Sequence, residues 1–398
     1  MDRLKRVAWG RVATMTVGAI CLGYAPIAMT ELWPYARPGA PAFGEWLLGK
    51  AVSPGYVAEA LATRIEPYRR SLVPLIVHSV LGGALMLLGP VQLLSAVRRR
   101  IRLHRAVGVA YAVTVYVSMA GAAVYLARTA PRDAFDGASF WLVLATILVG
   151  TVLSVTFGVL AAVGRLPDVH QRWMLLCYGY LMTAPLLRLE WGALPWILPD
   201  GLSMEEVNRV AIMHLGSVVV FGALLASRSL DRRASHPSDA ARATWAPWPI
   251  LALAHLAGVA ALVWIGRAFW EYGAEGRRLF AAFLLPYAAT YVVMAVRQRL
   301  AGRRGRPWAR EEWRLHLIAL CLAPAFSVAA TLSFERFMAL DGLTALSAGV
   351  GIGTGVLAFA ATTAVSLRVL YAREVARREA LTAGSPPSET ATSGLARI

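Results

Sequence analysis

Acidic side chains are scarce in this chain of 398 residues, which has 23 Asp and Glu against 40 Lys and Arg. Ten stretches of the chain contain no charged side chain at all, and most of them are apolar. Proton-coupled transporters and pumps usually carry an acidic residue inside the membrane, and none lies within these stretches. The scarcity of acids therefore disfavours that class of protein.

Cysteine is also rare, and its three copies stand alone in separate apolar runs, at Cys21, Cys177 and Cys321. This spacing excludes a disulfide framework and a C-x-x-C metal or redox motif. No nucleophile–base or metal-hydrolase spacing is present, so a soluble-type enzyme active site is the least favoured interpretation. Lys5 and Lys50 are the only lysines, and with the abundant alanine they indicate a bacterial origin with a GC-rich genome.

Long charge-free runs dominate the rest of the sequence. A helix rises about 1.5 Å per residue, so about 20 apolar residues cross a ~30 Å hydrocarbon layer. The runs are Val12–Thr30, Ser71–Val97, Ala106–Ala127, Gly137–Gly164, Trp173–Leu187, Val210–Ser227, Ala243–Gly266, Leu279–Val296, Leu315–Phe334 and Gly342–Leu367. They predict an all-α, polytopic membrane protein with about ten transmembrane helices.

Arginine is distributed unevenly over the segments that join these runs. If the N-terminus is cytoplasmic, the cytoplasmic segments hold 27 of the 40 basic residues against 9 acidic ones, and the rest holds 13 against 14. Short cytoplasmic loops of membrane proteins carry an excess of Lys and Arg. The asymmetry predicts cytoplasmic N- and C-termini and a multi-pass protein of the bacterial inner membrane. The net charge of +17 is therefore explained by the orientation of the chain in the lipid bilayer, and it does not indicate nucleic-acid binding.

The runs fall into two groups. We expect a six-helix membrane bundle over residues 1–230 and a four-helix membrane bundle over residues 248–370. A polar, turn-rich cytoplasmic linker over 231–247 joins them, and residues 371–398 form a cytoplasmic, largely disordered tail. The one long connection precedes the second run, and a short helix is expected there after Ser53-Pro54.

Two motifs carry glycine or proline inside apolar runs. Gly89–Gln92 interrupts the second crossing at Pro90, and a broken helix in a membrane often lines a polar cavity. Gly349–Gly355 superficially resembles a phosphate-binding loop, but it lies inside an apolar run with no preceding strand. Its small-xxx-small spacing instead predicts close packing between helices.

Histidine is the main ionisable residue near the membrane interior, and four copies pair by depth. His78 and His214 each lie eight residues into crossings that run in the same direction, at about 12 Å of helical rise. His104 and His170 begin crossings on the opposite side. Two levels of paired imidazoles suit a di-haem cytochrome b, since imidazole is a common axial ligand of haem iron. The alternative is structural histidines that hydrogen-bond to neighbouring helices or face lipid headgroups.

Five short motifs follow one another between about residues 72 and 190. They are His78–Gly83, Gly89–Gln92, Arg102–Gly108, His170–Met174 and Leu187–Arg188. In this order they resemble the predicted bacterial membrane family called domain of unknown function 2306, over about 30% of the chain. Members commonly have an arginine shortly after the Trp-Met pair, where this chain has Leu175, Leu176 and Cys177. The resemblance implies a polytopic membrane protein without an established activity, and it singles out His78, Gln92, His104, Arg105, His170, Arg172, Trp173 and Arg188.

Three functions remain open. The leading hypothesis is electron transfer by haem b, bound through His78/His214 and His104/His170, with a quinone or another redox partner and no metal besides haem iron. The second is a small-molecule transporter or channel-like protein. Its pocket residues would be Gln92, Arg105, Arg172, Trp173 and Arg188. The third is an accessory membrane protein without a cofactor, whose Arg-rich loops hold a partner or anionic lipid.

Overall fold

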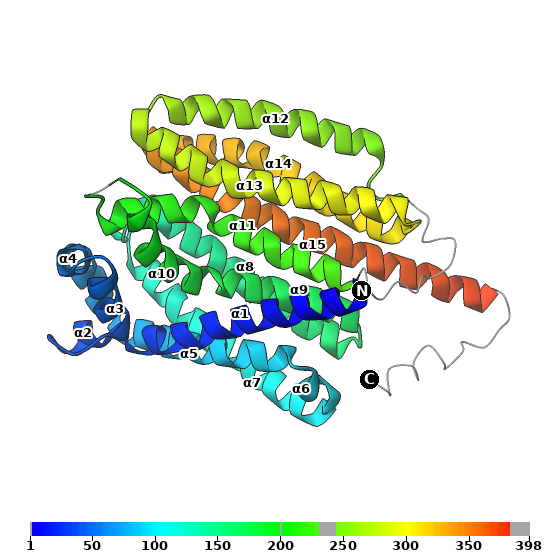
Figure 1. Cartoon of the computed structure of the whole chain (residues 1–398), viewed down its shortest axis with the longest axis horizontal. Coiled ribbons are helices and arrows are strands. Elements are labelled where there is room, and N and C mark those ends of the chain that lie inside the picture. The colour runs from blue at the N-terminus through cyan, green and yellow to red at the C-terminus, as the bar shows by residue number, and fades with distance from the viewer. Residues whose placement is uncertain (1, 200, 231–243, 383–398) are drawn as a thin grey trace.

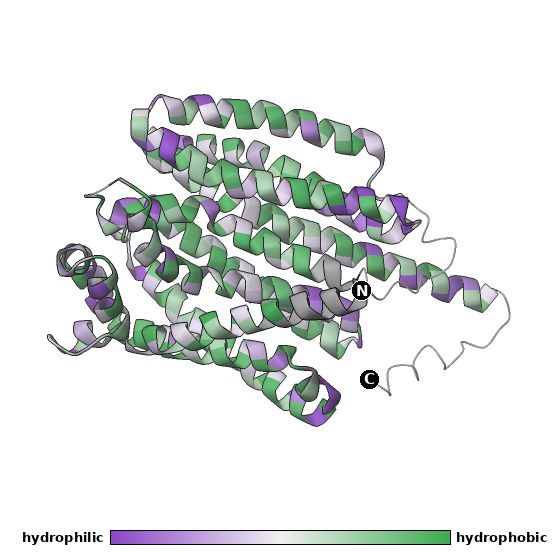
Figure 2. Cartoon of the chain, viewed as in Figure 1, coloured by the Kyte–Doolittle hydropathy of each residue, from purple (hydrophilic) through white to green (hydrophobic). Residues whose placement is uncertain are grey.

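A computed structural model describes residues 2–199, 201–230 and 244–382. Helices and the loops between them make up these residues, and no strand occurs among them. Nine of the helices are long and apolar enough to cross a membrane. Figure 2 shows hydrophilic residues mostly at the two ends of the long helices and hydrophobic residues along their middles. The expected all-α, multi-pass architecture is therefore confirmed.

The long helices lie side by side as one bundle (Figure 1). They are α1 (Asp2–Thr30), α5 (Leu72–Leu93), α7 (Ile101–Arg128), α8 (Gly137–Val163), α11 (Met204–Leu230), α12 (Trp248–Trp270), α13 (Gly273–Arg303), α14 (Pro307–Met338) and α15 (Gly342–Thr382). The first residues of α1 and the last turns of α15 lie at the same end of the bundle. That placement requires an even number of passes, and the cytoplasmic location of this end stays a prediction.

The remaining pass consists of two short helices in place of the expected continuous crossing. α9 (Pro167–Leu181) ends at Met182, and α10 (Thr183–Ala193) continues from it. Both pack against α11. Pro185 has no N–H, so the carbonyl of Leu181 loses its helical partner at this point. The prediction that Gly89–Gln92 interrupts the second crossing is wrong, because α5 continues through Pro90 as far as Leu93.

Three short helices between α1 and α5 cover one end of the bundle, which we call the capped end. They are α2 (Trp33–Ala36), α3 (Phe43–Ala51) and α4 (Pro54–Arg70). α4 begins as predicted, with Pro54 in its first turn and the Ser53 hydroxyl accepting a hydrogen bond from the Tyr56 amide. Contacts of α3 with α10 and of α4 with α11 hold this layer on the bundle.

α6 (Ser95–Arg99) and two 3-10 turns, η1 (Pro131–Asp133) and η2 (Leu194–Trp196), complete the described elements. α6 lies in the connection between α5 and α7, at the end opposite the capped one. η1 leads into α8, and η2 follows α10. Apart from the connection that contains residues 231–243, the connections away from the capped end are short.

The two expected groups of helices share one core. α15 packs against α14 of its own group and against α8, α9 and α11 of the first group. One cluster of buried side chains contains residues from both groups. α15 also continues to Thr382, past the expected bundle boundary at residue 370. Most of the expected linker, residues 231–243, and the tail beyond 382 lie outside the described residues.

Close packing explains the glycine motif in α15, as its spacing predicts. A Cβ on Gly349 would meet Thr331 and the Ser327 carbonyl of α14, and a Cβ on Gly353 would meet Ser327 and the Ala323 carbonyl. These glycines therefore let two helix backbones approach closely in a medium where packing drives association.

Replacing Gly353 by Leu should push α15 away from α14. Overpacking of this kind typically lowers the free energy of unfolding by about 1–3 kcal/mol. Thermal melting of the detergent-purified protein, followed by tryptophan fluorescence, measures the effect. Ala360→Leu is the matched control, because Ala360 lies on the same helix with an exposed side chain. Equal melting temperatures for the two variants would contradict the packing role of the motif.

Candidate functional site: a cavity near the capped end

A cavity of about 190 Å³ lies near the capped end, among α1, α4, α5 and the helices from α7 to α11. Most of its lining is apolar, with the break between α9 and α10 contributing Leu181, Thr183 and Ala184. Its other polar or ionisable side chains are Tyr24, Glu31, Tyr68, His78, Ser79, Ser118, Tyr125, Tyr180, Arg188 and Trp191. An apolar cavity with a few convergent polar groups is the usual form of a small-molecule site.

Small residues shape the wall formed by α5 and α7. Gly121 of α7 lies against the Pro74 carbonyl and His78, where a Cβ would not fit. This close approach sets His78 beside Ser118, one turn earlier on α7. Gly82 has no atom near the position of its missing Cβ, and it lines the cavity. The absence of a side chain at Gly82 therefore keeps part of the cavity empty.

His78 is the one histidine of the four that lines the cavity. Its Nδ1 lies 3.1 Å from the Ser118 carbonyl oxygen and 3.1 Å from the Ser118 hydroxyl. The same hydroxyl donates to the His78 carbonyl over 3.0 Å. These contacts orient the imidazole and leave its Nε2 without a hydrogen-bond partner in the described chain.

Arg188 also lines the cavity, as an ion pair with Glu31, which directly follows α1. Its guanidinium carbon lies 3.9 Å from the centre of a Trp191 ring. Arg64 of α4 approaches Trp191 as well, at 4.6 Å. Cation–π contacts of this kind gain strength when the groups are shielded from water. The pair therefore ties α1 to α10, and Trp191 ties α10 to α4.

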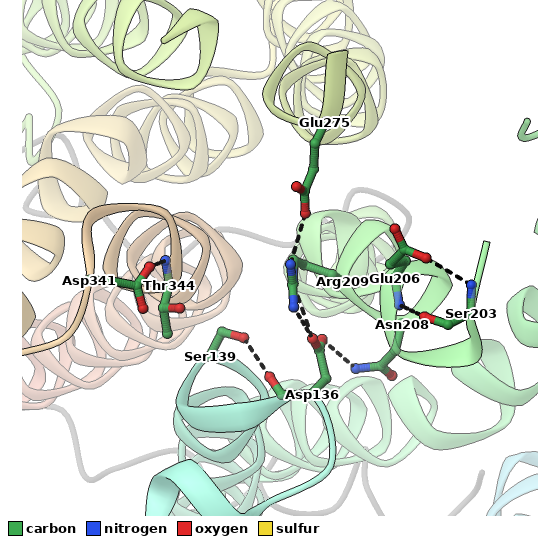
Figure 3. A network of polar contacts seen from close by, with 9 residues as sticks. All are labelled: Asp136, Ser139, Ser203, Glu206, Asn208, Arg209, Glu275, Asp341 and Thr344. Atoms are coloured by element: carbon green, nitrogen blue, oxygen red, sulfur yellow. Dashed lines mark hydrogen bonds and ion pairs between the residues drawn. The ribbon is translucent and has the colours of Figure 1, made fainter. Parts of the chain in front are cut away.

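Trp191 connects the cavity wall to a charged network at the capped end. Its indole N–H donates to Asn208 of α11 over 3.1 Å, and Asn208 donates to Asp136 over 2.9 Å. Figure 3 shows Asp136 between Asn208 and Arg209, with Arg209 reaching on to Glu275 of α13. This network joins both groups of helices, and sequence analysis did not identify it.

Burial raises the pKa of Asp136 to about 7 from its ordinary value of 3.8. The side chain of Asp136 is fully buried, which disfavours the carboxylate. Arg209 opposes the shift, but the same guanidinium also binds Glu275, so one cation serves two carboxylates. Asp136 therefore binds a proton more readily than an ordinary aspartate does.

The other three histidines do not line the cavity, and His104 and His170 lie close enough together to interact electrostatically. His214 Nε2 lies 2.8 Å from Glu190 Oε1, on α10. His170 Nδ1 lies 2.8 Å from the Gly158 carbonyl oxygen of α8. His104 Nδ1 is buried without a hydrogen-bond partner in the part of the chain that is described. His78 and His214 have no contact with each other among the described interactions, so pairing by depth does not by itself place their rings together.

The remaining predicted pocket residues lie away from the cavity. Gln92 donates to the His104 carbonyl over 3.2 Å and so holds the α5–α7 connection. Arg105 is exposed. Trp173 is buried against Phe157 and Phe359, with ring centres 4.9 and 5.1 Å away.

Arg172 forms a buried bidentate pair with Glu312 of α14, over 2.6 and 3.1 Å. Each residue is 2% exposed. A buried guanidinium that lost this carboxylate would be strongly unfavourable. Arg172 therefore fixes α9 to the second helix group. Sequence analysis identified Arg172 but not its partner, which stands 140 residues away.

Two of the residues that sequence motifs singled out, His78 and Arg188, thus meet at one cavity. The model of a family described as "Predicted membrane protein (DUF2306)" matches residues 75–226, which contain both. This segment of the chain is therefore similar to that family. The match confirms the resemblance and extends it past Arg188 to most of α11. No curated protein and no solved structure matches the chain.

The matched segment supplies most of the cavity wall, and the description of the family names no activity. Glu31, Tyr24 and Tyr68 come from outside the matched segment. Their positions carry little sequence signal, because they belong to the end of the first crossing and to the cap. Asp136 and Arg209 stand at the ends of charge-free runs, and that position is the only signal that could have drawn attention to them.

The raised pKa of Asp136 predicts a pH-dependent stability. The folded state binds this proton more tightly than the unfolded chain does, so the free energy of unfolding should fall as pH rises from about 4 to about 7. Asp136→Asn should flatten this dependence. Melting temperatures measured in detergent across this range provide the test.

Asp133→Asn is the matched control, since Asp133 lies three residues earlier with 46% of its side chain exposed. The control should keep the slope of the wild-type protein. An unchanged slope in Asp136→Asn would contradict the assignment of the titration to Asp136.

Proposed function

We propose that this membrane protein binds a small molecule from the lipid phase in the cavity near the capped end. The observation that carries the proposal is the convergence of His78 and the Glu31–Arg188 pair on an otherwise apolar cavity. Ionisable side chains are costly within a membrane, and they usually mark a functional site there. The break at Met182 supports the proposal, because irregular backbone at membrane depth commonly lines a cavity.

Packing beneath the cavity favours a binding pocket over a path through the bundle. Cys21 of α1 contacts the Tyr178 hydroxyl at 2.8 Å and Met182 at 3.8 Å. Leu85, Val115 and Val155 are fully buried in the same cluster. Cys21, Val115 and Val155 lie farther from the capped end than the cavity residues on the same helices. A ligand would therefore enter from the lipid or from the capped end.

Filling the cavity tests this proposal. Gly82→Phe should place an aromatic ring in the cavity, because Gly82 lines it and a Cβ there would meet no atom within 4 Å. We expect the variant to fold and to lose the small molecule that copurifies with the wild-type protein. Solvent extraction of both proteins from nanodiscs, followed by mass spectrometry, measures the difference.

Val80→Phe is the control, because Val80 is on the same helix with an exposed side chain and does not line the cavity. This variant should retain the wild-type extract. Identical extracts from Gly82→Phe and Val80→Phe, or no enriched molecule in the wild-type protein, would refute the cavity as the binding site.

Haem b binding is a second candidate, and two hydrogen bonds favour it. In both His78 and His170 the Nδ1 atom faces a backbone carbonyl, at 3.1 and 2.8 Å. This contact commonly fixes a metal-ligating histidine with Nε2 free. His214 would have to release Glu190 to ligate through Nε2.

Expression with added haem, followed by a reduced-minus-oxidised spectrum of the purified protein, tests this candidate. Bound haem b should give Soret and α bands, and both should weaken in His170→Ala. The absence of these bands in the wild-type protein would rule out haem while leaving the cavity proposal intact.

A further inference from the structure

Four of the seven hydroxyl groups that line the cavity already donate their proton to a backbone carbonyl. Ser118 donates to the His78 carbonyl over 3.0 Å, and Ser79 donates to the Ala28 carbonyl. At the helix break, Thr183 donates to the Tyr180 carbonyl over 2.6 Å. The Tyr180 hydroxyl donates to the Gly355 carbonyl over 3.0 Å. A hydroxyl has a single proton, so these groups can only accept a further hydrogen bond.

His78 is an acceptor for a related reason. The Ser118 proton is used on the His78 carbonyl, so it is not available to His78 Nδ1. Nδ1 also faces the Ser118 carbonyl oxygen, which can only accept. With a lone pair on Nδ1, both Ser118 oxygen atoms that face it would be acceptors opposite an acceptor. Nδ1 therefore carries the proton of the neutral ring, and Nε2 presents a lone pair to the cavity.

From this pattern we infer that the ligand is a neutral, lipid-phase phenol whose hydroxyl donates a hydrogen bond to His78 Nε2. The inference rests on the proposed function and specifies its ligand class. A buried acceptor without a donor is unfavourable, so the cavity selects a molecule that supplies one. A ligand carbonyl would instead face a lone pair on Nε2.

Charge and shape favour a phenol over other donors. Glu31 is the carboxylate in the lining, and it is already paired with Arg188. The cavity therefore has no unpaired carboxylate for an ammonium group. Aromatic rings form much of the wall, and they pack well against another ring. These rings belong to Tyr24, Tyr68, Tyr125, Phe140, Tyr180 and Trp191. The quinol form of a quinone belongs to this class, whereas the oxidised form lacks the donor.

A matched pair of probes tests the inference on the full chain in nanodiscs. Para-propylphenol and para-propylanisole have similar shapes, but only the phenol has a hydroxyl proton. Isothermal titration calorimetry should show roughly tenfold tighter binding of the phenol, the value of one buried neutral hydrogen bond. Equal binding, or tighter binding of the anisole, would overturn the inference and leave the cavity proposal standing. Binding of neither probe would overturn both.

Two variants assign the preference to His78. His78→Leu should bind the phenol no better than the anisole, because it removes the acceptor. Val80→Leu, on the same helix with an exposed side chain outside the cavity, should keep the preference. A preference that persists in His78→Leu, or disappears in Val80→Leu, would overturn the assignment of Nε2 as the acceptor. If His78→Leu does not fold, the wild-type comparison of the two probes decides alone.

Discussion

Hydrocarbon offers no hydrogen-bond partner, so every polar group of this bundle that lies at membrane depth needs a partner within the protein. The buried charges follow this constraint in pairs between helices. Arg172 binds Glu312, and Arg188 binds Glu31. Each pair joins helices that are distant in sequence, so partnering of charge also determines which helices meet. Four hydroxyl groups in the cavity lining follow the same constraint by donating to backbone carbonyls, and this pattern bears on what the cavity can bind.

Trp191 joins the cavity wall to the charged network at the capped end. On one side it packs against Arg188, which lines the cavity, and on the other it donates to Asn208 of the charged network. Asp136 and Arg209 continue the network to α13 of the second group. The cavity wall and the interface between the two helix groups are therefore linked by direct contacts. Protonation of Asp136 changes the charge of this interface near neutral pH.

The number and approximate position of the helices could be predicted from sequence, because crossing a bilayer requires long apolar runs. The break between α9 and α10 could not be located from sequence, because Pro90 and Pro185 both lie in apolar runs. Only at Pro185 does one helix end and another begin. His78 and Arg188 were identified through their motifs. The partners Glu312 and Glu31 were not, since sequence spacing gives no information about contacts between distant helices. The distance along each crossing likewise placed His78 and His214 at one level in the membrane, but it did not show which way either ring faces.

An electron cryomicroscopy map of the full chain in nanodiscs made from its host membrane tests the central claim most directly. The account predicts density for a non-protein molecule in the cavity, with a polar atom about 2.7–3.2 Å from His78 Nε2. A map in which a protein side chain fills the cavity or bonds to His78 Nε2 would contradict it.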